Sequence, residues 1–64
     1  MVKINGEEQN LAGCTISAVL SDAGFDPGRV AVERNGEIVP KRIYGETILA
    51  DGDSVEIVGF VGGG

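Results

Sequence analysis

Two Asn-Gly dipeptides, Asn5-Gly6 and Asn35-Gly36, constrain the fold of this chain more than any other feature. Asn-Gly is a strong short signal for a β-hairpin, because both central residues of a type I′ turn need a positive φ angle. A segment with β-type alternation leads into each dipeptide: 2–5, which includes Asn5 itself, in the first case and 30–34 in the second. The sequence therefore predicts two tight hairpins, one at the start of the chain and one in its second half.

The segments around these turns indicate which side chains face a core. In the first hairpin, Val2 and Ile4 alternate with polar residues, whereas the return segment 7–11 is polar and is expected at a sheet edge. In the second hairpin, the β-branched segment 30–34 is followed by a short return. That return ends at Pro40, which has no N–H to donate to a sheet.

A short amphipathic helix is predicted between the two hairpins. Thr15 is a suitable N-cap, because its hydroxyl can accept a hydrogen bond from a free amide of the first turn. Gly24 suits the left-handed residue that ends a helix. The apolar residues between these two recur at helical spacing and form one stripe: Ile16, Val19, Leu20 and Ala23.

The second half of the chain supplies one further strand. Segment 41–46 is expected to form a single helical turn or 3-10 piece that places Ile43 or Tyr44 in the core. After a brief extended segment, the turn 51–53 leads into a last strand, 54–58. Alternation in this strand turns Val55 and Ile57 inward.

The order of elements is thus strand, strand, helix, strand, strand and strand. One short helix that covers one face of a small mixed sheet of about five strands closes such a core. This α+β layout is that of the β-grasp, or ubiquitin-like, fold, in which the first and last strands lie side by side. The pattern alone leaves other small α+β rolls open. We assign residues 1–59 to this domain and residues 60–64 to a flexible C-terminal tail.

Composition narrows the class of protein. At 64 residues, of which 42% are hydrophobic, the chain suits one small globular domain with no deep catalytic cleft. A net charge of −5 argues against nucleic acid as a partner. Histidine, the commonest general base, is absent. A single cysteine, with no signal sequence or membrane span, indicates the cytoplasm and no membrane partner.

The end of the chain carries a single functional group. Residues 60–64 have no reactive side chain, which leaves the α-carboxylate of Gly64. With a reference pKa of roughly 3.3–3.7, this group is an anion and a poor electrophile at neutral pH. We therefore expect the chain to present this carboxylate to another enzyme, as its substrate, partner or carrier, and not to be an enzyme itself.

The residues before Gly64 suit contact with such an enzyme. Gly62 and Gly63 lack a Cβ, so their backbone can thread into a narrow channel. Phe60 and Val61 are apolar and follow the last core strand. We expect them to dock the partner together with Val58, which points to the outer face of the sheet.

Other candidate groups have simpler explanations. Cys14 precedes the predicted helix, where a thiolate is favoured, but no base accompanies it and a packing role is expected. Tyr44 is expected to fill the core. The acidic residues match no calcium-loop spacing, no metal site is expected, and a solvated surface is predicted for Glu7, Glu8, Glu33, Glu37, Glu46, Asp51 and Asp53.

The order and spacing of these motifs resemble the ThiS family of bacterial sulfur carriers along the whole chain. The segments that carry the resemblance are Ile4-Asn5-Gly6, the hairpin 30–40, the turn and strand 51–58, and Val61-Gly62-Gly63-Gly64. Each motif alone is common, and their combination is specific. Gly62 departs from many members, which have a bulkier small residue at this position.

The resemblance implies a reaction cycle. A ThiF-type adenylyltransferase would transfer AMP from ATP to the carboxylate of Gly64. A cysteine desulfurase or another sulfur donor would then convert that group to a thiocarboxylate. A thiazole synthase of the ThiG type would use the sulfur to build the thiazole ring of thiamin. ATP belongs to the partner, and no bound cofactor is expected on the chain.

Two alternatives stay open. Carriers of molybdopterin synthesis and of other thiolation pathways use the same chemistry. A non-covalent β-grasp interaction module, with an incidental tail, belongs to a different class. Deletion of Gly63 and Gly64 separates the classes, because a carrier would lose all function and keep its fold, whereas a binding module would still bind.

Overall fold

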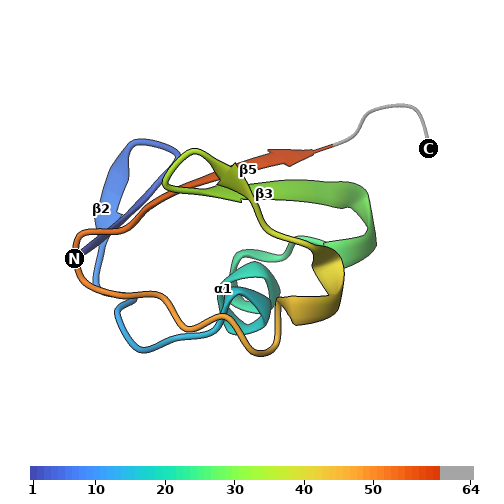
Figure 1. The fold of residues 1–64 in the computed structure, drawn as a ribbon, viewed down its shortest axis with the longest axis horizontal. Coiled ribbons are helices and arrows are strands. Elements are labelled where there is room, and N and C mark those ends of the chain that lie inside the picture. Colours follow the sequence, from blue (N-terminus) through green and yellow to red (C-terminus); the bar gives the residue numbers. More distant parts are fainter. Residues whose placement is uncertain (60–64) are drawn as a thin grey trace.

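The computed structural model describes residues 1–59, which form a mixed sheet with one α-helix against one of its faces (Figure 1). The helix is α1 (Ile16–Ala23), and two 3-10 turns are η1 (Pro27–Arg29) and η2 (Lys41–Ile43). The strands are β1 (Val2–Ile4), β2 (Glu7–Gln9), β3 (Val30–Arg34), β4 (Glu37–Ile38) and β5 (Ser54–Gly59).

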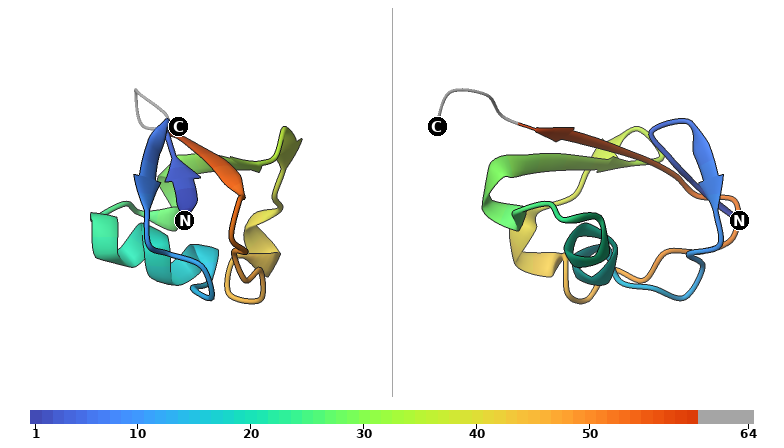
Figure 2. Two further views of the ribbon diagram at one scale, coloured as in Figure 1. Left: turned by 90° about the vertical axis from the view of Figure 1, so that its left-hand side faces the viewer. Right: turned by 180° about the vertical axis from the view of Figure 1, so that it is seen from behind.

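The sheet places the last strand at its centre. The strand order is β2-β1-β5-β3-β4, with β5 parallel to β1 and antiparallel to β3. Figures 1 and 2 show α1 below the sheet, while no element among residues 1–59 covers the opposite face. This is the β-grasp arrangement, and it confirms the predicted fold class and the adjacent first and last strands. The predicted tail, 60–64, lies outside the described residues.

Both hairpins form at the Asn-Gly turns. The φ angles are 49° at Asn5 and 86° at Gly6, and 53° at Asn35 and 86° at Gly36. Two consecutive positive φ angles define the type I′ turn, whose twist matches that of the flanking strands. β2 is exposed throughout and lies at the sheet edge, as its polar sequence predicts.

The core lies between the sheet and α1. Tyr44, rather than its half-buried neighbour Ile43, is the residue of the helical turn that is fully enclosed, with 3% of its surface exposed. The inward residues predicted for β1 and β5 are all buried. Among residues 1–59, the buried hydrophobic residues are Val2, Ile4, Ile16, Val19, Leu20, Val30, Val32, Val39, Tyr44, Leu49, Val55 and Ile57.

The predicted caps define α1. The hydroxyl of Thr15 accepts a hydrogen bond from the N–H of Ala18 at 3.1 Å, and Gly24 ends the helix with a φ of 82°. The predicted apolar stripe is wrong at its last member, because Ala23 is exposed. This residue lies beside a groove in the surface, where no strand covers it. Among the described residues, no helix is long and apolar enough to cross a membrane.

The turn η1 was not expected from the sequence. Asp26 caps it, accepting a hydrogen bond from the N–H of Gly28 at 2.9 Å, and Pro27 occupies its first position. Proline is favoured there because the first amides of a helix have no acceptor within it. The turn joins the end of α1 to β3.

Candidate functional site

The predicted site begins where β5 ends. β5 runs through the middle of the sheet and leaves it at the end of the molecule opposite the N-terminus (Figures 1 and 2). Gly59 is the last described residue of the strand. The predicted site residues Phe60, Val61 and 62–64 lie outside the described residues, so their roles stay predictions.

Two neighbours fix the direction of β5. On one side, β3 pairs with it as far as Gly59. On the other side, β1 pairs with it only as far as Val55. The side-chain amide of Asn5 then takes the place of a further strand residue. Its Oδ1 accepts from the N–H of Ile57 at 2.7 Å, and its Nδ2 donates to the C=O of Ile57 at 3.2 Å.

The outer face of the sheet presents apolar and acidic side chains beside the end of β5. Val58 is 56% exposed there, as predicted, and lies opposite the half-buried Ala31 of β3. Glu33 and Glu56 lie directly opposite each other on the same two strands. Like charges in such a pair destabilise a sheet. Among residues 1–59, neither carboxylate is in an ion pair.

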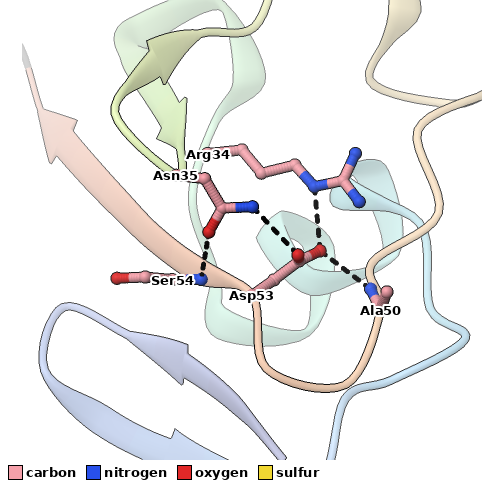
Figure 3. Close-up of polar contacts among 5 residues, drawn as sticks. All are labelled: Arg34, Asn35, Ala50, Asp53 and Ser54. Atoms are coloured by element: carbon pink, nitrogen blue, oxygen red, sulfur yellow. Dashed lines mark hydrogen bonds and ion pairs between the residues drawn. The ribbon is translucent and has the colours of Figure 1, made fainter.

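The start of β5 is anchored by a buried carboxylate, that of Asp53 (Figure 3). Its two oxygens accept hydrogen bonds from Arg34 Nε at 2.8 Å, Asn35 Nδ2 at 3.0 Å and the N–H of Ala50 at 2.8 Å. The Asn35 side chain also accepts from the N–H of Ser54 at 2.9 Å. The network ties the β3–β4 turn to the strand that leads into the predicted site.

Asp53 corrects the sequence prediction. Asp51 is exposed as expected, but only 8% of the Asp53 surface is exposed. Burial raises the pKa of Asp53. The hydrogen bonds from Ala50, Asn35 and Arg34, together with the Arg34 charge, lower this pKa by more than burial raises it. The net result is a pKa below the usual value, so the carboxylate is charged at neutral pH. Of the other acidic residues assigned to the surface, Glu33 is half-buried and the remainder are exposed.

The remaining candidate groups do not form a reaction centre. Cys14 is half-buried against the core, and its N–H donates to the C=O of Leu11 at 3.1 Å. Tyr44 is in the core, as predicted. Among residues 1–59, no three His, Cys, Asp or Glu residues come together as metal ligands.

Two shallow grooves lined by residues that the structure describes flank the sheet. One, of about 140 Å³, lies between α1 and the strands β1 and β5 and is lined mainly by apolar residues, including Ile4, Val19 and Ile57. The other, of about 200 Å³, lies next to β4 and includes Ile38 and Pro40. Neither contains a cysteine or a nucleophile paired with a base, so neither suggests catalysis.

Comparison with known proteins gives one consistent match. The sequence matches the ThiS family over residues 2–64. It is 41% identical to the sulfur carrier protein ThiS of Bacillus subtilis, with 100% of each chain covered. The structure resembles that of the thiamine biosynthesis protein ThiS of Geobacter metallireducens, with a TM-score of 0.78, 30% identity, and coverage of 98% of this chain and 97% of that chain.

Longer proteins also match. The chain is 55% identical over 62 residues to a thiazole synthase of Paramagnetospirillum magneticum. The matched stretch covers 95% of this chain and 19% of the relative. A thiazole synthase of Magnetococcus marinus is 44% identical, with 98% and 20% covered. The chain thus spans about a fifth of the length of these two relatives.

Proposed function

The chain belongs to the ThiS family, and from this membership we propose that it is a sulfur carrier protein of thiamin biosynthesis. The observation that carries the proposal is the match along the whole chain, in sequence to relatives named sulfur carrier protein ThiS and in fold to a thiamine biosynthesis protein ThiS. A carrier presents a group to other enzymes. The small core and the absence of histidine from the sequence are in keeping with that role.

The proposed site of sulfur attachment is the α-carboxyl group of Gly64. A carboxylate is a poor electrophile, so a partner of the ThiF type transfers AMP from ATP to one carboxylate oxygen and releases pyrophosphate. The outer sulfur of a persulfide on a cysteine desulfurase, or another sulfur donor, attacks the acyl carbon, and AMP leaves. The bond formed is carbon–sulfur, so the product is an acyl disulfide that keeps the sulfur–sulfur bond of the persulfide, and a thiol of the partner then cleaves that sulfur–sulfur bond. A disulfide forms on the partner side, and the carrier keeps a thiocarboxylate.

The proposed acceptor of the sulfur is a thiazole synthase of the ThiG type. Its support is the occurrence of a stretch 55% identical to this chain within a protein named thiazole synthase. A carrier and an acceptor that work in sequence gain from such linkage, because it raises their effective concentration. The proposed location is the cytoplasm, and ATP is a substrate of the partner rather than a cofactor of the carrier.

The proposed docking surface is the outer face of the sheet beside the end of β5. Val58 offers an exposed apolar side chain, and Phe60 and Val61 continue the apolar sequence. The facing carboxylates of Glu33 and Glu56 have no cation partner among residues 1–59. A basic side chain of a partner would relieve their repulsion, so charge complementarity favours a partner with a basic face.

Reconstitution tests the proposed chemistry. The chain is incubated with the ThiF-type enzyme, ATP and sulfide, and its intact mass is measured. The expected product is heavier by the difference between one sulfur and one oxygen atom, and AMP is released in equal amount. With sulfide as donor, HS⁻ displaces AMP directly and no reductant is required.

A matched control isolates the carboxyl group. A synthetic chain that ends in the carboxamide of Gly64 keeps the fold and the docking surface but offers no carboxylate. It should bind the enzyme and gain no sulfur. The proposal fails if the chain with a free carboxylate gains no sulfur from an enzyme that is active on another carrier, or if the carboxamide gains as much as the carboxylate.

A further inference from the structure

The β1 side of β5 changes partner along its length. Backbone pairing with β1 stops at Val55, and the Asn5 side chain then bonds to both backbone groups of Ile57. No strand among residues 1–59 pairs with this side of β5 beyond Asn5. The opposite side stays paired with β3 as far as Gly59. One edge of the central strand is therefore closed and the other is open.

The hydrogen-bond pattern shows where the backbone of Gly59 points. The N–H of Asn5 donates to the C=O of Val55, so the odd-numbered residues of β5 face β1. The N–H of Asn35 donates to the C=O of Ser54, so the even-numbered residues face β3. Gly59 thus directs its N–H and C=O to the open side. It is exposed, and a Cβ placed on it would meet no atom within 4 Å.

A groove lined by described residues also lies on this side of β5 and reaches as far as Ile57, two residues before the exposed Gly59. The groove of about 140 Å³ between α1, β1 and β5 includes Ile57 and has no lining residue from β3 or β4. Ala23, at the end of α1, lines it and is exposed. An extended segment of another protein can therefore approach the open edge.

Beyond Phe60 and Val61, the sequence that follows Gly59 limits how a partner can recognise it. Residues 62–64 are all glycine and offer only main-chain groups. A strand added to a sheet edge binds through main-chain hydrogen bonds, so it suits a segment without side chains. Gly59 is the first residue of β5 at which such pairing finds free groups.

We propose that the adenylating partner adds an extended strand to the β1 side of β5, starting at Gly59, and that Asn5 keeps this edge available by ending the β1 pairing at Ile57. The inference rests on the proposed function for the identity of the partner. It adds the mode of recognition, in which main-chain pairing on β5 holds the segment that leads to Gly64.

Amide hydrogen exchange, followed by NMR, tests the proposal on the whole chain. In the free chain the N–H of Gly59 should exchange fast, while that of Val58, which faces β3, should be protected. Addition of the ThiF-type enzyme without ATP should slow exchange at Gly59 by at least about tenfold, because the amide gains an acceptor. Unchanged exchange at Gly59 in the complex overturns the proposal.

A backbone substitution tests the contribution to recognition. A synthetic chain with an ester in place of the amide between Val58 and Gly59 lacks the Gly59 N–H. Loss of one net hydrogen bond in this ester chain should raise the KM for adenylation roughly twofold to tenfold and leave kcat unchanged. The matched control is an ester at Glu8, because the hairpin register points that N–H away from β1 at the far edge of the sheet. Its KM should equal that of the all-amide chain, and urea unfolding verifies that both esters fold.

The remaining outcomes are distinguishable. Equal KM values for the two esters overturn the proposal. Protection of the Gly59 amide that appears in the chain alone as its concentration rises also overturns it, because a second copy would then be the added strand. If the all-amide chain is never adenylated, the proposed function fails. If it is adenylated normally and Gly59 stays unprotected, only the strand addition fails.

Discussion

Replacement of Asp53 by alanine should remove much of the stability of the domain. The carboxylate accepts hydrogen bonds from Arg34, Asn35 and Ala50. A hydrogen bond to a charged group contributes about 1.5–3 kcal/mol and a neutral one about 1 kcal/mol. The Arg34 side chain is 32% exposed and regains water when the carboxylate is lost. We therefore expect the free energy of unfolding to fall by about 2–4 kcal/mol. For comparison, the hydrophobic core of a chain this short supplies roughly 3–5 kcal/mol.

Urea unfolding followed by circular dichroism measures this loss. With an m-value of about 1 kcal/mol per molar urea, the midpoint should fall by about 2 M or more. Asp51→Ala is the matched control, since the one ion pair of this exposed carboxylate among residues 1–59 is with the terminal ammonium of Met1. Such a surface pair contributes at most about 1 kcal/mol. A loss below about 1 kcal/mol for Asp53→Ala would refute the role of the network.

The contribution of Asp53 should also depend on pH. Its pKa in the folded chain lies below the reference value of 3.8. A lowered folded pKa gives stability that is present above the unfolded pKa and is lost as the pH falls through the folded pKa. The difference in unfolding free energy between the natural chain and Asp53→Asn should therefore shrink below about pH 5. A difference that stays constant from neutral pH to strong acid contradicts the assignment.

Three further substitutions test separate parts of the account. Thr15→Ala removes the acceptor for the Ala18 N–H and should lower the unfolding free energy by about 1 kcal/mol in urea titrations, whereas Thr15→Ser should not. Asn5→Gly, which tolerates the positive φ of this turn residue, removes both bonds to Ile57 and should cost at least about 2 kcal/mol; a smaller loss would mean that β5 does not need this support. Val58→Asp should raise KM for adenylation at least about fivefold, with stability changed by less than about 1 kcal/mol. Ile48→Asp, equally exposed but away from the outer face, should leave KM unchanged; equal effects of the two would exclude a docking role for Val58.

Local chemistry made most of the fold predictable. Asn5-Gly6 and Asn35-Gly36 specify their turns without reference to the rest of the chain, because few other dipeptides tolerate two positive φ angles. The caps at Thr15 and Gly24 are equally local. The start of η1 carries a local signal too, because Asp26 precedes Pro27 and caps the turn.

The features that the sequence did not reveal depend on long-range contacts. Asp53 is a turn residue by sequence, and it becomes buried because the fold brings Arg34, 19 residues away, to its side. The side chain of Asn5 meets Ile57 across 52 residues. No local pattern marks either pair. The same holds for Ala23, which is exposed because it lines the groove between α1, β1 and β5 and is not packed against the sheet.

The most direct test of the central claim is the location of sulfur in the carrier. The protein is isolated from its own cells or from the reconstituted reaction. Without prior digestion, it is then fragmented in a mass spectrometer. A sulfur-for-oxygen replacement confined to fragments that contain Gly64 is the predicted result. Sulfur found on Cys14 instead of Gly64 would contradict the account. So would a carrier that has no sulfur on Gly64 while the thiazole is being made.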